Sequence, residues 1–289
     1  MKRGWICLIW IFALVSLAGS EEIYCRYALG DHTYYGKVDR GIILQLDAAP
    51  WAGGQVTGHQ VRVEQVKLLH PSEPTVIVGI SGSYREAWEG KKPFKTIRWF
   101  LKPPSSAASP GDDVELPRAL DELLVESELV VIIGKTVKNA GLEEAREAIF
   151  GYTAGNDIVG SATSYYKMIG DVIPASDPLL PAGLKIGDGF APYGPYIYRG
   201  VDWNNRKREL VVTNPETGKQ TIYQHNTSNF MFPPDKIVSD LSNVLTLHPG
   251  DVIFTGTTKA LPAHVGDIME VIIEGFTPLK NVVAPPRYH

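Results

Sequence analysis

The most informative stretch of this 289-residue sequence is residues 125–133, which read Val-Glu-Ser-Glu-Leu-Val-Val-Ile-Ile. Its leucine and β-branched residues predict a buried strand. Residues i and i+2 of a strand share a face, so Glu126 and Glu128 are expected to point the same way. Adjacent carboxylates beside a buried strand repel each other, and a hard cation such as Mg²⁺, Mn²⁺ or Ca²⁺ removes that conflict. Two solvent-facing carboxylates fit these residues equally well.

Three segments outside this stretch favour the metal site. Residues 151–157, Gly-Tyr-Thr-Ala-Gly-Asn-Asp, read as a glycine-punctuated turn that supplies a third carboxylate, Asp157. Lys185 offers a cation beside a rigid loop that contains Gly and Pro. The apolar strand predicted at 252–254 is followed by Thr-Gly-Thr at 255–257, which brings hydroxyl groups and flexible backbone. Together these segments supply acids, a cation and hydroxyls for one polar site.

Strand-like apolar runs dominate the chain, and helical patterns are few. The predicted strands of the larger part are 75–78, 96–101, 129–133, 196–198, 209–213, 252–254 and 269–273, and the predicted helices are 142–150 and 235–244. Residues 23–47 alternate between polar and apolar side chains and predict a small antiparallel meander, followed by a loop at 48–58. We therefore expect a β-rich α+β fold, with a small β domain at residues 21–70 and a large domain at 71–289.

The composition is that of a globular protein, with 44% hydrophobic and 21% charged residues. The formal net charge of −4 argues against a dedicated nucleic-acid binder, which would carry a basic stripe. Two cysteines exclude a disulfide scaffold and an all-cysteine zinc site.

Residues 1–20 read as a signal peptide. Lys2 and Arg3 precede an apolar run at 5–17, and Ala-Gly-Ser at 18–20 provides the small residues that a signal peptidase needs. The apolar run is shorter than the about 20 residues of a membrane span, although an uncleaved anchor is the alternative. Ser20 stands where a lipidated cysteine would be required. We therefore expect export to the periplasm or the medium, without a stable membrane anchor.

Residues 71–283 resemble the fumarylacetoacetate hydrolase family, because several of its motifs occur here in family order. They are Leu-Lys-Pro-Pro-Ser-Ser at 101–106, Pro-Gly-Asp-Asp-Val at 110–114, Glu-x-Glu with Val-Val-Ile-Ile-Gly-Lys at 126–135, the segment 151–157, Lys-x-x-Asp at 185–188, Pro-x-Gly-Pro at 192–195, Asn-Thr-Ser at 226–228, Leu-x-Pro-Gly-Asp-Val-Ile-x-Thr-Gly-Thr at 247–257 and Gly-Asp at 266–267. The N-terminal meander resembles the small domain that many members carry.

The resemblance implies a mixed β-sandwich or roll, usually a homodimer, with Mg²⁺ or Mn²⁺ held by Glu126, Glu128 and Asp157. It implies a small 2-oxo, diketo or enolic acid as substrate, converted through a metal-bound enolate by hydrolysis of a carbon–carbon bond, decarboxylation or isomerisation. Lys185 would add positive charge beside the substrate, and Thr257 would donate a hydrogen bond to its carboxylate.

One family motif is altered in this chain. Many active members carry Asn-Tyr-x-x-His-x-x-Glu on a mobile lid, and here Tyr84 matches, Ala87 stands in place of the histidine and Gly90 in place of the glutamate. Glu86 and Glu89 are three residues apart and can share one face of a helical turn, so they are the candidate replacements for the base. Solvent-exposed lid carboxylates are the alternative.

The complete prediction is a hydrolase of carbon–carbon bonds. Tyr84, Lys102, Lys185 and Thr257 are its predicted substrate-binding residues, and Lys185, Glu86 and Glu89 its catalytic candidates. A decarboxylase, an isomerase and a non-catalytic metal binder are the alternatives. Trp88 and Trp99 near the lid either line the pocket or pack in the core.

Overall fold

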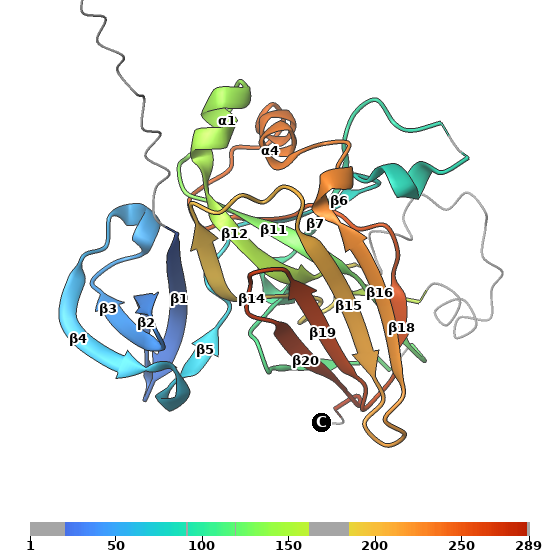
Figure 1. Cartoon of the computed structure of the whole chain (residues 1–289), viewed down its shortest axis with the longest axis horizontal. Helices are drawn as coiled ribbons and strands as arrows, with labels where there is room; N and C mark the ends of the chain where they lie inside the picture. The colour runs from blue at the N-terminus through green and yellow to red at the C-terminus, as the bar shows by residue number, and fades with distance from the viewer. Residues whose placement is uncertain (1–20, 91, 119, 162–184, 288–289) are drawn as a thin grey trace, which may run out of the picture.

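The computed structural model of the chain describes residues 21–90, 92–118, 120–161 and 185–287. The predicted signal peptide lies outside these residues. Within them, no helix is long and apolar enough to cross a membrane. Figure 1 shows a small group of strands at the N-terminus beside a larger β-rich body.

The N-terminal strands form the predicted meander. They are β1 (Glu22–Leu29), β2 (His32–Asp39), β3 (Ile42–Leu46), β4 (Val56–Arg62) and β5 (Lys67–Leu69). Arg40 and Gly41 join β2 to β3 with φ values of 47° and 80°, the left-handed pair that a two-residue hairpin turn requires. The predicted loop at 48–58 is only partly correct, because it contains a short 3₁₀ helix, η1 (Pro50–Ala52), and the start of β4.

A long sheet connects this group to the larger body. Its order is β4-β3-β2-β1-β14-β12-β11-β17-β6-β7. The additional strands are β14 (Ala191–Arg199), β12 (Ile149–Asn156), β11 (Ser127–Ile133), β17 (Val252–Phe254), β6 (Ile77–Ser81) and β7 (Arg98–Lys102). The junction is the antiparallel pair β1–β14, in which Tyr24 lies opposite Ile197. The sheet therefore continues from residues 22–69 into the rest of the chain.

A second layer packs on this sheet and encloses the main core. It is the five-stranded sheet β16-β15-β19-β20-β9, and β13-β10-β18 form a small third sheet. Their bounds are β16 (Gln220–Asn226), β15 (Lys207–Thr213), β19 (Ile268–Ile273), β20 (Leu279–Ala284), β9 (Asp113–Glu115), β13 (Val159–Gly160), β10 (Leu123–Val125) and β18 (Leu261–Ala263); β8 (Ala107–Ala108) pairs with β14. Leu129, Leu210 and Val271 meet in the core between the layers. The predicted β-rich sandwich is confirmed.

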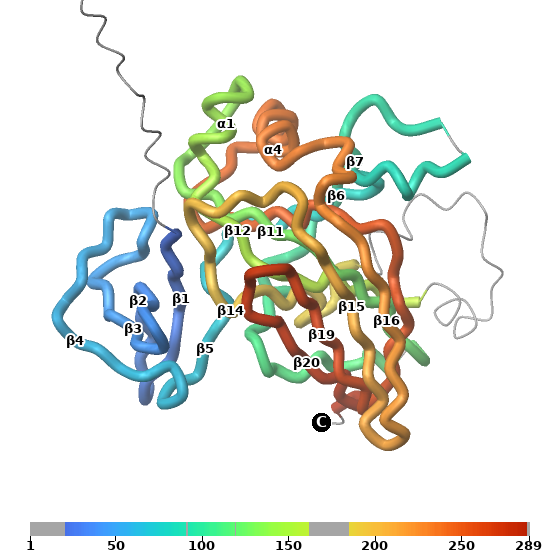
Figure 2. Tube along the Cα trace, viewed as in Figure 1, coloured from blue at the N-terminus to red at the C-terminus, as the bar shows by residue number. Residues whose placement is uncertain are grey.

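Two helices cover the other face of β11. α1 (Leu142–Ala148) and α4 (Pro234–Ser242) lie side by side, as Figure 2 shows, and both were predicted. Ala145 and Ile237 pack with Val131 of β11, so this strand is buried on both faces. The remaining 3₁₀ helices are η2 (Val63–Gln65), η3 (Arg85–Trp88), η4 (Pro104–Ser106) and η5 (Thr227–Asn229).

The predicted turn at 151–157 is wrong, since residues up to Asn156 belong to β12. Its glycines serve close packing instead of a turn. A Cβ on Gly155 would lie 2.4 Å from the side chain of Val130, and one on Gly151 would lie 2.6 Å from the carbonyl oxygen of Tyr198. Glycine inside a strand marks such close approaches.

Candidate metal and substrate site

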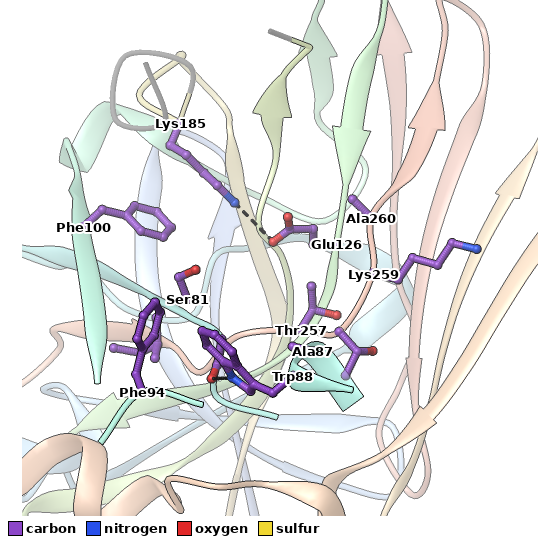
Figure 3. A pocket seen from close by; sticks show the side chains of 13 residues that line it. Ser81, Ala87, Trp88, Phe94, Phe100, Glu126, Lys185, Thr257, Lys259 and Ala260 are labelled. Carbon is purple, nitrogen blue, oxygen red and sulfur yellow. Dashed lines mark hydrogen bonds and ion pairs between the residues drawn. The ribbon is translucent and has the colours of Figure 1, made fainter. Parts of the chain in front are cut away.

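Antiparallel pairing of β11 with β12 brings the three predicted carboxylates together. Ser127 lies opposite Asn156, so the end of β12 lies beside the start of β11. One oxygen from each of Glu126, Glu128 and Asp157 lies within 4.8 Å of the others. Figure 3 shows Glu126 at the wall of the adjoining cavity.

Hydrogen bonds hold the backbone of this corner. The Glu126 N–H donates to Asn156 Oδ1 at 2.9 Å, and the Asp157 N–H donates to the Glu126 carbonyl oxygen at 3.1 Å. The carboxylates therefore extend from a rigid pair of strand ends, which preorganises them for a ligand.

Two lysines lie against the carboxylates. Lys185 Nζ is 2.5 Å from Asp157 Oδ2 and 3.2 Å from Glu126 Oε2. Lys102 is 1% exposed, and its Nζ lies 2.7 Å from Asp157 Oδ1. The same ammonium donates to three backbone carbonyl oxygens, those of Ile158, Lys185 and Phe190, at 2.9, 2.7 and 2.9 Å.

Burial changes the protonation of the three acids. It raises the pKa of Glu126 to about 7, although Lys185 partly offsets the effect. Burial and the neighbouring Asp157 and Glu126 raise the pKa of Glu128 well above its usual value. Burial also opposes ionisation of Asp157, but Lys102 and Lys185 outweigh it and hold its pKa below the usual value. The two glutamates therefore lack sufficient positive charge from the protein itself.

Glu128 has one satisfied and one unsatisfied oxygen. Its Oε2 accepts the Gly256 N–H at 2.6 Å, whereas Oε1 is buried with no hydrogen-bond partner among the described residues. Gly256 has a φ of +95°, and a Cβ there would lie 2.2 Å from Ser83 Oγ, so only glycine can present this N–H.

These residues fit a divalent cation. A buried carboxylate oxygen without a donor, in a cluster made only of oxygen ligands, is the chemistry that Mg²⁺ and Mn²⁺ select. Glu126, Glu128 and Asp157 would hold the ion.

A cavity of about 440 Å³ opens beside Glu126. Its described lining residues are Ile80, Ser81, Gly82, Ala87, Trp88, Phe94, Phe100, Glu126, Lys185, Thr257, Thr258, Lys259 and Ala260. Thr257 Oγ1 is buried without a partner among the described residues and is therefore free to donate to a ligand. The cavity joins a polar side at Glu126 and Lys185 to an apolar wall.

Comparison with known protein families agrees with the fold. A family profile described as fumarylacetoacetate (FAA) hydrolase C-terminal matches residues 77–284, and a second, described as Rv2993c-like N-terminal, matches residues 24–71. The chain belongs to the fumarylacetoacetate hydrolase family.

Curated and solved relatives include enzymes. The fumarylacetoacetate hydrolase domain-containing protein 2 homolog of Dictyostelium discoideum is 33% identical over 250 residues, which are 79% of this chain and 77% of that protein. The Escherichia coli homoprotocatechuate catabolism bifunctional isomerase/decarboxylase is 32% identical over 68% of this chain, which spans only 42% of that protein. The structure of 5-carboxymethyl-2-hydroxymuconate delta-isomerase from Mycobacterium smegmatis superposes with a TM-score of 0.77 at 26% identity, covering 91% of this chain and 99% of that one.

Of the four predicted substrate-binding residues, two line the cavity and two are not among its described lining residues. Lys185 and Thr257 line the cavity. Lys102 lies behind Asp157, and the buried Tyr84 packs its ring on Phe230 at 4.2 Å, so neither is among the lining residues.

The predicted catalytic glutamates also lie outside the described lining. Glu86 is exposed and accepts a hydrogen bond from Asn229, and Glu89 is exposed after η3. Ala87 does line the cavity, at the position where the family motif has its histidine.

Sequence reasoning missed eight of the described lining residues and left one undecided. The missed residues are Ile80, Ser81, Gly82, Phe94, Phe100, Thr258, Lys259 and Ala260. Trp88 lines the cavity, whereas Trp99 is exposed and does not. In β7, Phe100 is less exposed than its neighbours Trp99 and Leu101. All three side chains are apolar, so no polar–apolar alternation in the sequence indicates which of them faces inward.

A histidine supports the cavity wall from behind. His225 Nδ1 lies 3.0 Å from Arg208 Nη2, which donates to it, and 3.3 Å from Thr258 Oγ1. Burial, helped by Arg208, lowers the pKa of His225 to about 2. The imidazole is therefore neutral in the folded protein and keeps Nδ1 as an acceptor.

This histidine should make the fold sensitive to acid. In the unfolded chain a histidine has a pKa near 6.5. The stability that depends on neutral His225 is therefore fully present above about pH 6.5 and is lost as the pH falls below that value. Between pH 8 and pH 5 we expect a loss of about 2 kcal/mol from His225. Urea unfolding of the wild type and His225→Asn at both pH values measures it. The variant should lack this loss, the exposed control His264→Asn should retain it, and equal pH dependence in all three proteins would contradict it.

Proposed function

We propose that this family member is a divalent-metal-dependent enzyme that breaks a carbon–carbon bond of a small 2-oxo acid. One observation carries the proposal: the cluster of Glu126, Glu128 and Asp157 opens through Glu126 onto a cavity that also presents Lys185 and Thr257. When bound there, Mg²⁺ or Mn²⁺ would supply a Lewis acid for the oxo group of the substrate.

The protein's own groups bind and orient the acid. Burial lowers the pKa of Lys185, but Asp157 and Glu126 outweigh burial and raise it above the usual value. Lys185 therefore stays protonated and gives the cavity a fixed positive charge for an anionic substrate. The unpartnered hydroxyl of Thr257 can donate to the substrate carboxylate. Lys102 holds Asp157 from the buried side and takes a positioning role.

The cavity wall favours decarboxylation over hydrolysis. Hydrolysis needs a group that takes a proton from water, and such a base typically contributes about 10²–10⁴-fold. Among the described lining residues there is no histidine, and Glu126 is the only carboxylate. Decarboxylation needs no attacking water: the bond from carbon 3 to the leaving carboxylate breaks, its electron pair passes into the 2-oxo group, CO₂ leaves, and a solvent proton later adds to carbon 3.

Turnover by the purified full chain tests this assignment. With Mg²⁺ or Mn²⁺ present, oxaloacetate decarboxylation should exceed hydrolysis of 2,4-dioxopentanoate by about 10²-fold or more, the usual contribution of the base that the wall lacks. If 2,4-dioxopentanoate is hydrolysed faster than oxaloacetate is decarboxylated, the protein is a hydrolase and the proposed decarboxylase is wrong. If neither compound is turned over in the presence of metal, the proposed cleavage of a carbon–carbon bond is wrong, and an isomerase and a non-catalytic metal binder remain as the alternatives.

Metal affinity should depend on pH. With a pKa of about 7, Glu126 holds a proton at pH 6 that an incoming cation must displace. Mn²⁺ binding should therefore be about tenfold weaker at pH 6 than at pH 8. Titration calorimetry near pH 6.5 in two buffers of different ionisation enthalpy should detect proton release on binding. Equal affinity at both pH values without proton release would contradict the coupling.

We also propose export and a homodimer. Strand β1 begins at Glu22, directly after the predicted cleavage at residue 20, so removal of residues 1–20 leaves the described strands complete. Expression with the native N-terminus, followed by N-terminal sequencing of the exported protein and its mass in solution, tests both.

A further inference from the structure

Three aromatic side chains, those of Trp88, Phe94 and Phe100, form the far side of the cavity. We call them the aromatic wall. In Figure 3, Trp88 and Phe94 lie opposite Lys185 and Glu126, with Phe100 along one side. Trp88 and Phe94 meet edge to face, with ring centroids 4.3 Å apart and planes at 73°.

Two glycines leave room for these rings. A Cβ on Gly79 would lie 2.2 Å from the Phe100 ring, which pairs with it across β6 and β7. A Cβ on Gly82, which also has a φ of +67°, would lie 2.7 Å from the Trp88 indole. Both rings therefore lie directly on backbone, a packing that only glycine at these positions permits.

Polar contacts fix the orientation of the aromatic wall. Trp88 Nε1 donates to the Gly82 carbonyl oxygen at 2.8 Å. The guanidinium of Arg98 lies 3.5 Å from the centre of the Phe94 ring, and Lys185 Nζ lies 5.0 Å from that of Phe100. Such cation–π contacts and the indole bond hold the rings in place before a ligand arrives.

The cavity beside Glu126 is larger than a short oxo acid requires. Ligand pockets of roughly 300–1,000 Å³ accommodate drug-sized molecules, and this cavity measures about 440 Å³. An oxo acid at Glu126, Lys185 and Thr257 leaves the aromatic wall for the remainder of the substrate. Preoriented rings stack best on a flat π-system.

We propose that the substrate is a 2-oxo acid whose carbon 3 carries both an aromatic ring and the leaving carboxylate, and that the aromatic wall binds this ring. The inference rests on the proposed function for the oxo-acid end, whereas the preference for the ring is a separate property of Trp88, Phe94 and Phe100. For such a substrate, decarboxylation gives CO₂ and, after protonation at carbon 3, an arylpyruvate.

Binding and turnover together test the proposal. Using intrinsic tryptophan fluorescence of the Mn²⁺-loaded full chain, phenylpyruvate should bind about 10- to 100-fold more tightly than pyruvate, the discrimination that an apolar pocket of this kind supplies. 2-Oxo-3-phenylbutanedioate should be decarboxylated with a KM about tenfold or more below that of oxaloacetate. Trp88→Ala should reduce both preferences to less than about threefold. Trp99→Ala, next to Phe100 on β7 but outside the described lining of the cavity, should leave both unchanged.

The outcomes separate this inference from the proposed function. Equal affinities for phenylpyruvate and pyruvate overturn it, as does a Trp88→Ala variant that keeps the full preference. If phenylpyruvate binds preferentially but no compound is turned over, the aromatic wall is supported as a binding site and the proposed decarboxylase is wrong. Because Trp88 itself contributes to the fluorescence signal, binding to the Trp88→Ala variant is measured by titration calorimetry.

Discussion

Replacing Glu128 with glutamine should weaken metal binding by about 100-fold or more while leaving the metal-free fold intact. The substitution removes one of three oxygen ligands, and even the loss of an outer-shell partner typically costs about 10–100-fold in metal affinity. We expect Mn²⁺ affinity to fall by about 100-fold or more and metal-dependent turnover to be lost with it. The fold should tolerate the change because Glu128 is buried, has a pKa raised well above its usual value and has one oxygen without a partner.

The test compares metal titration with urea unfolding in the absence of metal. Glu128→Gln should bind Mn²⁺ more weakly but stay within about 1 kcal/mol of the wild type in free energy of unfolding, since the amide oxygen can still accept the Gly256 N–H. Glu122→Gln, a partly buried acid outside the cluster, serves as the matched control and should bind Mn²⁺ normally. Undiminished affinity in Glu128→Gln would remove this residue from the site.

Among the substitutions proposed here, Lys102→Met should cause the largest decrease in the free energy of unfolding. The ammonium forms a fully buried ion pair with Asp157 and satisfies three carbonyl oxygens. Breaking such a pair by removing one partner typically costs about 3–5 kcal/mol, because the other charge stays buried. Urea unfolding at pH 7 measures the change.

The surface pair of Lys67 with Asp112 provides the control. It has a similar separation, 2.8 Å, but the Lys67 side chain is 61% exposed. Exposed pairs contribute about 0–1 kcal/mol, so Lys67→Met should have little effect. A second variant, Lys102→Met combined with Asp157→Asn, should recover part of the stability, because it also removes the buried negative charge, and should bind metal weakly because it lacks the proposed ligand Asp157. A loss below about 1 kcal/mol in Lys102→Met would show that the buried pair does not stabilise the fold.

Local patterns predicted the strands and the acidic cluster well. The strand period of two placed Glu126 and Glu128 on one side, and the observed cluster includes both with Asp157. The predicted helices at 142–150 and 235–244 correspond to α1 and α4. The strands, the helices and the pair Glu126 and Glu128 depend on neighbours in the chain, which a linear reading captures. Asp157 was assigned to the same site from the order of the family motifs.

Packing between distant segments was less accessible to sequence reasoning. The glycines at 151 and 155 suggested a turn, but they allow β14, β11 and β17 to approach β12 closely. The altered lid motif was readable from Ala87, whereas the positions of Glu86 and Glu89 outside the cavity lining depend on how η3 packs.

By itself, then, the sequence determined the β-rich class, the family and the three carboxylates, because short-range spacing and ordered motifs encode them. Only the tertiary structure decided that Lys102 contacts Asp157 and is not among the described lining residues of the cavity, and that Trp88 and Phe100 form one wall. Lys102 and Asp157 are far apart in the chain, as are Gly79 and Phe100. Pairing of β6 with β7 brings Gly79 and Phe100 together, whereas Lys102 of β7 contacts Asp157, which follows β12, although these two strands are not paired. The physical reason is that a side chain's burial and partners depend on what the folded chain places opposite it, which its own sequence neighbours do not specify.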